Sequence, residues 1–258
     1  MAKHYAISDI HGMWDIYEQV CAMLQPDDVV YFLGDAGDRG YANFECIKAI
    51  YENPQWIYLK GNHEDMFVRG IRELTNEECM MADNDDFDIW MYNGGYDTYE
   101  GWLNDGADTS WLSKLNCLPL TAQYTNSKGV VFHMSHAGYT CGRKDQMWGD
   151  QLLWSREHFC DHWPDEYSDE YINDICIHGH TPIPYLIEQL EWLRDDIKPW
   201  NKKVPEARAY CDGHKICIDN GAFYTGATVL YDLDEMTAIP IFDREFKKPV
   251  EEEEDESQ

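Results

Sequence analysis

The sequence predicts an α/β protein, because strand-like and helical patterns alternate early in the chain and strands dominate later. Two strand-like runs, HYAISD and DVVYFLGD, lie on either side of the helical pattern MWDIYEQVCAML. A second helical pattern, ANFECIKAIYEN, precedes a further strand-like run, QWIYLKGN. Strand, helix and strand in this order predict β-α-β units, whose strands lie parallel in one sheet.

Both helical patterns place apolar residues on one face, at spacings of three and four residues. In the first pattern these residues are Trp14, Tyr17, Val20, Cys21 and Leu24. In the second pattern they are Phe44, Ile47, Ile50 and Tyr51. We therefore expect both helices to pack against the sheet through these faces.

Residues 63 to 115 read mainly as helix and loop, with the acidic stretch DNDDFD and the turn NGG at residues 93 to 95. We expect a helical insert over about residues 73 to 115 beside the sheet. Strands then dominate, in the runs GVVFHMSH, DICIHGH, ARAYCD, KICIDNGA, ATVLYDL and TAIPIFD. One amphipathic helix interrupts them over about residues 185 to 197, with Leu186, Leu190, Leu193 and Ile197 on one face.

The chain reads as one domain over residues 1 to 245, because no repeat or linker divides it. The remaining residues, 246 to 258, include the acidic run EEEEDESQ, which we expect to be disordered.

The composition excludes several functional classes. A formal net charge of −29 at pH 7 repels phosphate backbones and anionic lipids, so we expect neither nucleic acid nor a membrane as partner. No apolar run approaches the ~20 residues of a membrane span, and the start MAKHYAISD has no apolar leader, so a cytoplasmic location is expected. Nine cysteines without a CxxC pair indicate reduced thiols rather than disulfides or a zinc site.

Polar side chains beside glycines follow five of the predicted strands. The motifs are SDIHG, GDAGDRG, GNHE, SHAG and HGHT. Ligands of open α/β sheets bind outside the carboxyl ends of the strands, so these side chains can converge. The candidate metal ligands are Asp9, His11, Asp35, Asn62, His136 and His180. Carboxylate, amide and imidazole donors without a thiolate suit manganese, iron or zinc, and one shared carboxylate would allow two ions.

Each motif alone has a simpler interpretation. Asp9 or Ser8 would serve as a helix cap, Asn62 as the N-cap of the next helix, and Arg39 as a surface charge. Asp9 and His11 are one residue apart, so in an extended strand their side chains point to the same side and can bind one ion together. Five such motifs after five strands favour a joint metal site over independent caps and turns.

The order of these motifs resembles that of the PPP-type serine/threonine protein phosphatases within the calcineurin-like metallophosphoesterase superfamily. The resemblance runs from Asp9 to the IDNGA and ATVLYDL strands, and LLWSRE and NGG resemble the compact bacterial and phage members. It implies a four-layer β-sandwich flanked by helices, with a dinuclear metal site at the carboxyl ends of the strands. Asp9, His11 and Asp35 would hold the first ion. Asp35 would also bridge to the second ion, with Asn62, His136 and His180.

The resemblance also implies the catalytic roles. Two divalent ions, Mn2+ or alternatively iron or zinc, would activate a water, so that no enzyme nucleophile is needed. His63 would protonate the leaving group, and Asp38 would orient His63 and raise the pKa of its ring. Arg39 and Arg156 would bind the phosphate oxygens. The substrate would be a phosphorylated protein or a small phosphomonoester.

Differences between this sequence and the motifs of related families narrow the expected function. Pro182 in GHTP replaces the second histidine of the Gly-His-x-His motif found in the broader superfamily. Asp38 and Glu64 differ from the pattern of the diadenosine tetraphosphate hydrolases, which remain an alternative. The carboxy-terminal motif of the eukaryotic phosphatases is missing, so we expect no obligatory regulatory subunit. A catalytically inactive interaction scaffold is the other alternative, although none of the expected ligands is missing. His178, beside Gly179 and His180, is expected to be a buried strand histidine.

Overall fold

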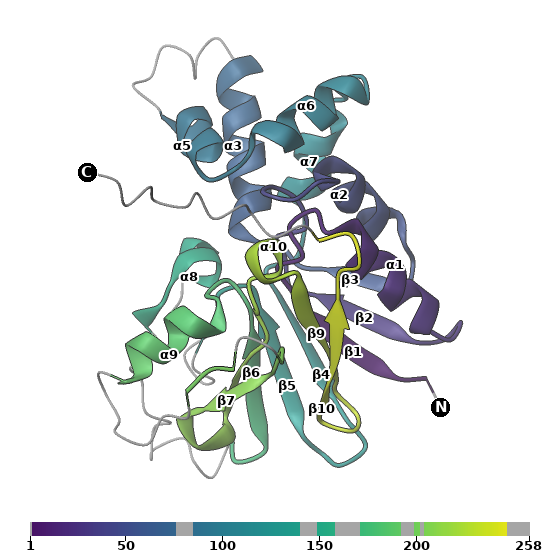
Figure 1. The fold of residues 1–258 in the computed structure, drawn as a ribbon, viewed down its shortest axis with the longest axis vertical. Helices are drawn as coiled ribbons and strands as arrows, with labels where there is room; N and C mark the ends of the chain where they lie inside the picture. Colours follow the sequence, from purple (N-terminus) through teal and green to yellow (C-terminus); the bar gives the residue numbers. More distant parts are fainter. Residues whose placement is uncertain are drawn as a thin grey trace, which may run out of the picture.

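Two mixed β-sheets pack face to face, with helices on their outer sides (Figure 1). The computed structural model describes residues 2–75, 85–139, 149–157, 171–191, 199–201 and 204–246. This arrangement confirms the predicted α/β class and the sandwich flanked by helices. Residues 247 to 258, which hold most of the predicted acidic tail, lie outside the described ranges.

The first sheet has the order β10-β9-β1-β2-β3. β1 (His4–Ile7), β2 (Val29–Phe32) and β3 (Trp56–Tyr58) lie parallel, as the predicted β-α-β units require. The crossover helices are α1 (Trp14–Met23) and α2 (Asn43–Glu52). β9 (Ala227–Asp232) and β10 (Thr237–Phe242) form an antiparallel hairpin, and β9 pairs with β1.

The second sheet has the order β4-β5-β6-β8-β7. β5 (Val131–Ser135), β6 (Asp174–His178) and β8 (Lys215–Cys217) lie parallel, and β7 (Arg208–Tyr210) is antiparallel to β8. β4 (Thr121–Thr125) pairs antiparallel with β5, and the sequence did not predict it. Its residues are half-buried or exposed, so the pattern TAQYT lacks the apolar run by which the other strands were recognised.

Both crossover helices pack on the first sheet largely as predicted. Ile16 and Val20 of α1 and Phe44, Ile47 and Ile50 of α2 lie in the same buried cluster as the β1 and β2 side chains. The prediction is wrong for one residue of these faces, Tyr51, which is not buried. Tyr51 is 40% exposed, and its ring contacts Trp111 of the neighbouring helix at 5.3 Å between centroids. Trp111 is 3% exposed and belongs to the core cluster, so the Tyr51 ring covers the edge of the core from the solvent side.

Four helices form what we call the cap, at the top of Figure 1. They are α3 (Asn62–Thr75), α5 (Asp86–Tyr92), α6 (Tyr96–Asn104) and α7 (Ser110–Asn116). Aromatic rings fill its interior: Phe67 contacts Trp90 and Trp102, with 5.1 and 6.1 Å between ring centroids. The predicted turn at Asn93 to Gly95 connects α5 to α6, and Gly94 has a φ of 96°.

In the described ranges, three further α-helices lie outside the cap, namely α8 (Gly149–Trp154), α9 (Ile183–Glu191) and α10 (Ala222–Thr225). α9 corresponds to the helix predicted over residues 185 to 197, of which residues 192 to 197 lie outside the described ranges. Its apolar face packs on Tyr210 and Cys217 of the second sheet. The helix therefore covers one end of that sheet and stabilises it.

None of the helices in the described ranges is long and apolar enough to cross a membrane. Each cysteine in those ranges is a free thiol, in agreement with the sequence-based expectation.

Candidate metal centre

The predicted ligands lie directly after strands that belong to both sheets. Asp9 and His11 follow β1, Asp35 follows β2, and Asn62 begins α3 after β3. His136 and His180 follow β5 and β6 of the second sheet. All of these side chains are at most 9% exposed. The structure thus brings the predicted ligands together at the carboxyl ends of strands from two sheets.

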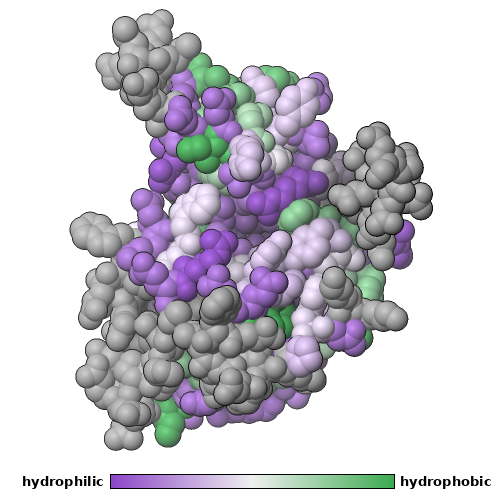
Figure 2. Space-filling model, turned by 60° about the vertical axis from the view of Figure 1, so that its left-hand side comes forward, coloured by the Kyte–Doolittle hydropathy of each residue, from purple (hydrophilic) through white to green (hydrophobic). Residues whose placement is uncertain are grey.

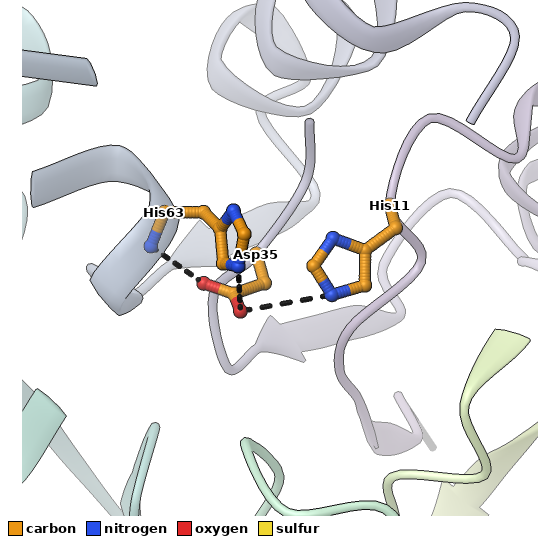
Figure 3. Close-up of side chains that lie close together, drawn as sticks. All are labelled: His11, Asp35 and His63. Atoms are coloured by element: carbon orange, nitrogen blue, oxygen red, sulfur yellow. Dashed lines mark hydrogen bonds and ion pairs between the residues drawn. The ribbon is translucent and has the colours of Figure 1, made fainter. Parts of the chain in front are cut away.

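The Asp35 carboxylate lies at the centre of this site. Its Oδ2 atom is 3.7 Å from Nε2 of His11 and 3.8 Å from Nε2 of His63. In Figure 3 the Asp35 carboxylate lies between the rings of these two histidines. The Oδ2 atom is also 3.4 Å from Nε2 of His136. Ligands that bind one ion at ~2.1 Å lie about 3 to 3.4 Å from one another, so this spacing is close to that of a coordination shell.

Two donor clusters share Asp35. One consists of His11, Asp35 and His63, and the other of Asp9, Asp35 and His136, with all donor atoms of a cluster within 4.8 Å of one another. Asn62 extends the second cluster, because its Oδ1 is 2.8 Å from Nε2 of His136 and 2.9 Å from Nδ1 of His180. A carboxylate common to two clusters is the arrangement that a bridging ligand requires.

The positions of the ring protons leave lone pairs directed at the centre. Nδ1 of His11 lies 2.9 Å from the Gly37 carbonyl and Nδ1 of His136 lies 2.8 Å from the Leu33 carbonyl. A carbonyl only accepts hydrogen bonds, so each Nδ1 carries the proton and each Nε2 presents a lone pair. These lone pairs face the Asp35 carboxylate, which is also an acceptor. Nε2 of His180 is buried without a hydrogen-bond partner, whereas Nε2 of His11 also lies 3.0 Å from Nη1 of Arg39. Hydrogen-bond acceptors that face one another repel, and a cation bound between them would remove this repulsion.

Burial controls the charge of these groups. It lowers the pKa of His11, His63, His136 and His180, so the rings are neutral and able to bind a metal. Burial together with the charge of Asp219 raises the pKa of Asp9 to about 7, and burial raises the pKa of Asp35 well above its usual range. A cation between these carboxylates would remove this penalty.

The geometry of Asp9 and His11 differs from the expected one. β1 ends at Ile7, and both residues have left-handed backbone conformations, with φ of 51° and 45°. Strand alternation therefore does not place their side chains, and they belong to different donor clusters. Neither caps α1, whose N-cap is Met13 without a side-chain hydrogen bond. The reasoning from an extended strand is therefore wrong, and the binding of one ion by Asp9 and His11 together stays a prediction.

His63 and Asp38 form a buried pair, with 2.5 Å between Nδ1 of His63 and Oδ2 of Asp38. The bond fixes Nδ1 as the protonated nitrogen and turns Nε2 toward Asp35. Burial, assisted by the positive charge of Arg39, lowers the pKa of His63 well below its ordinary value. The expected net increase through Asp38 is therefore not found, because removal of water from a buried ring outweighs the effect of its partner.

Arg39 reaches the centre from the loop after β2. Its Nη1 lies 3.0 Å from Nε2 of His11, and its guanidinium lies over the Phe223 ring at 4.8 Å. Arg156 follows α8 and donates from Nε to Oγ1 of Thr181 at 2.9 Å. Both arginines line one cleft of about 1090 Å³ that also borders His180. Arg39 is an exposed side chain, as the simpler reading expected, and it also borders this cleft, so its role in phosphate binding stays a prediction.

The cleft has aromatic walls. Tyr92 of α5 and Tyr185 of α9 line it together with Phe223 and Tyr224, and the first two are 93% and 57% exposed. α9 thus borders the cleft as well as stabilising the sheet. On the face turned forward in Figure 2, hydrophilic side chains gather across the middle of the molecule, below the cap.

Sequence reasoning assigned no role to several residues at this site. Asp219 follows β8, is buried, and affects the pKa of Asp9. Glu64 holds the loops around Asp35, and Trp90 and Thr98 contact Asp38. The run IDNGA after a strand was a usable signal for Asp219, whereas the cap residues gave none. His178 is a buried strand residue as expected, with Nε2 2.8 Å from the Tyr210 hydroxyl.

Comparison with known proteins gives one family. The family model described as calcineurin-like phosphoesterase matches residues 3–217. No curated protein matches the chain.

Solved structures share the fold at low sequence identity. A candidate diadenosine tetraphosphatase is 12% identical, with a TM-score of 0.58 and 95% of both chains covered. A metallophosphoesterase from Sphaerobacter thermophilus is 16% identical, with a TM-score of 0.51, over 94% of this chain and 89% of that one. A cold-active protein-tyrosine phosphatase from a Shewanella species is 14% identical, with a TM-score of 0.52, over 94% and 78%.

Proposed function

This chain belongs to the calcineurin-like phosphoesterase family, and on that premise we propose that it is a metal-dependent phosphomonoesterase acting on phosphoserine and phosphothreonine. The observation that carries the proposal is the position of Asp35, whose carboxylate belongs to two donor clusters at once. In the proposed site, Asp9, His11 and Asp35 hold the first ion. Asp35, Asn62, His136 and His180 hold the second, with Mn2+ as the expected metal.

Bound divalent ions would supply Lewis-acid activation of the phosphate ester and of the attacking water. The protein binds and orients the substrate around them. Arg39 and Arg156 border the same cleft and neutralise the charge of the phosphate oxygens. This local positive charge is needed because the chain as a whole has a net charge of −29.

His63 donates the proton that the leaving alkoxide needs. Its Nε2 faces the centre, at 3.8 Å from Oδ2 of Asp35, while its Nδ1–H is held by Asp38. The Asp38 carboxylate stabilises the doubly protonated ring and prevents it from turning away. Because burial lowers the pKa of His63, the resting ring is neutral, and its Nε2 has to take up a proton before it can donate one to the leaving group.

The proposal is tested by measuring hydrolysis with and without Mn2+. The substrates are p-nitrophenyl phosphate and peptides that contain phosphoserine or phosphothreonine. We expect Mn2+-dependent turnover and about two bound metal equivalents by elemental analysis. The His63→Asn protein should lose about 100-fold or more in kcat, in the range of general acid catalysis. His214→Asn, which lies away from the centre beside the Asp174 carbonyl, is the control. No metal-dependent turnover, or full activity of His63→Asn, would contradict the proposal.

A diadenosine polyphosphate hydrolase is the second candidate, because the cleft has aromatic walls. Tyr92, Tyr185, Phe223 and Tyr224 offer ring surfaces on which a nucleobase can stack. The volume of about 1090 Å³ exceeds what a phosphate group alone needs. Diadenosine tetraphosphate in the same substrate panel separates the two candidates. A kcat/KM for it at least tenfold above that for every phosphopeptide would favour the second.

A further inference from the structure

The cap contacts the proposed acid through Asp38. The Trp90 indole Nε1–H of α5 donates to Oδ2 of Asp38 at 3.0 Å. The Thr98 hydroxyl of α6 donates to Oδ1 of the same carboxylate. All three side chains are at most 1% exposed, so no water competes for these bonds. With the His63 contact, the carboxylate has three donors, which fix both of its oxygens.

The cap also supports the backbone at this point. Asp38 and Arg39 have φ values of 66° and 71°, a left-handed conformation that is unfavourable for residues other than glycine. The Asp38 N–H donates to the Thr98 hydroxyl oxygen at 2.9 Å, and the Arg39 N–H donates to the Gly94 carbonyl at 3.2 Å. Thr98 therefore binds Asp38 twice, once through its backbone and once through its carboxylate.

These contacts form a continuous chain from the cap to the centre. Thr98 and Trp90 hold Asp38, Asp38 holds Nδ1 of His63, and Nε2 of His63 faces Asp35. No other side chain in the described ranges donates a hydrogen bond to Asp38. The orientation of the His63 ring therefore depends on two residues that sequence reasoning did not single out and that do not touch the donor clusters.

We propose that Thr98 and Trp90 are positioning residues that direct the His63 proton toward the leaving group through Asp38. The inference rests on the proposed function of His63. It goes beyond that function because it makes the helical cap part of the proton-donating machinery. A purely structural role for Thr98 would be filled by valine, which has the same shape and no hydroxyl.

The first test compares leaving groups. Proton donation matters little for p-nitrophenyl phosphate, whose leaving group is a weak base, and matters greatly for phenyl phosphate. We expect Thr98→Val and Trp90→Phe to lose about tenfold or more in kcat on phenyl phosphate, with KM unchanged and a much smaller loss on p-nitrophenyl phosphate. Thr98→Ser keeps the hydroxyl and should restore the leaving-group dependence. Thr228→Val, at a buried threonine whose hydroxyl lacks a partner, is the matched control and should behave as wild type.

The second test does not depend on activity. The short His63–Asp38 hydrogen bond should give a downfield ring-proton resonance in the metal-free protein, assigned by its loss in His63→Asn. This resonance should move or broaden in Thr98→Val and remain in Thr98→Ser. An unchanged resonance and an equal loss on both aryl phosphates would overturn the proposal. If Thr98→Val does not fold, the leaving-group comparison and the ring-proton resonance of Trp90→Phe decide whether the proposal holds. Failure of the proposed function itself is distinct, because wild type would then lack metal-dependent turnover on either substrate.

Discussion

The buried carboxylate of Glu64 accepts a hydrogen bond of 3.0 Å from the backbone N–H of Asp35. It also accepts from the N–H groups of Gly61 and Ala36, at 2.7 and 2.9 Å, and from the Tyr58 hydroxyl at 2.7 Å. A single side chain thus ties together the loop after β2, the loop after β3 and the first turn of α3. These segments carry Asp35, Asn62 and His63.

We expect Glu64→Gln to destabilise the protein by about 2 kcal/mol or more. The amide of glutamine replaces one acceptor oxygen with a donor, so two buried donors lose their partner at roughly 1 to 3 kcal/mol each. Urea unfolding measures the change in the free energy of unfolding. Tyr58→Phe removes only one of the four donors and should cost less than Glu64→Gln. An equal or greater cost of Tyr58→Phe would show that Glu64 does not organise these loops.

Gly179→Ala is expected to reduce metal affinity by displacing Asp9. A Cβ atom at Gly179 would lie 2.0 Å from Oδ2 of Asp9 and 2.5 Å from the Ser8 hydroxyl oxygen, so the carboxylate has to move. Titration with Mn2+ should show at least a tenfold weaker apparent affinity, in the range observed when groups that orient metal ligands are lost. Gly149→Ala is the control, because a Cβ there meets only Leu120 at 3.4 Å. Wild-type affinity in Gly179→Ala would contradict the placement of Asp9.

Asp35→Asn is expected to abolish the binding of both ions while stabilising the metal-free protein. The amide keeps the Oδ1 acceptor for the His63 N–H, whose bond to Asp35 is 3.0 Å. Its NH2 group would replace Oδ2, which lies 3.4 Å from Nε2 of His136, so the amide can donate to a lone pair that the carboxylate repels. Elemental analysis after dialysis should find less than one metal equivalent, and the metal-free melting temperature should rise. Retention of two equivalents would exclude Asp35 as a shared ligand.

Asp219→Asn tests the pH dependence of the metal-free protein. Burial raises the pKa of Asp219 to about 7 from an ordinary value of 3.8. Because this pKa is raised in the folded state, the protonated Asp219 carboxyl makes its full contribution to the free energy of unfolding below pH ~4. That contribution is lost as the pH rises to ~7. The asparagine has no such loss, so its stability relative to wild type should increase from pH 4 to 7, at first by about 1 kcal/mol per pH unit, and then level off. Urea unfolding in EDTA at several pH values gives the difference. A constant difference across this range would mean that Asp219 is not a protonated buried acid.

Much of this protein was predictable from local patterns. The alternation of strand and helix up to residue 58 predicted the three parallel strands of the first sheet. This was possible because the spacing of apolar residues depends only on residues that are neighbours in the sequence. The positions of Asp35, Asn62, His136 and His180 after strands also followed from the sequence. β4 escaped prediction because its half-exposed residues have no distinctive apolar pattern.

The sequence by itself thus determined the α/β class, the strands that the candidate ligands follow and the chemical types of those ligands. The tertiary structure decided how Asp9 and His11 turn, because their left-handed backbone is maintained by hydrogen bonds from the N–H groups of both residues to Gly34 and Asp35. It also decided that Glu64, Thr98 and Trp90 support the centre, across separations of up to 60 residues. Such contacts depend on how distant segments of the chain pack together, so the local sequence pattern does not predict them.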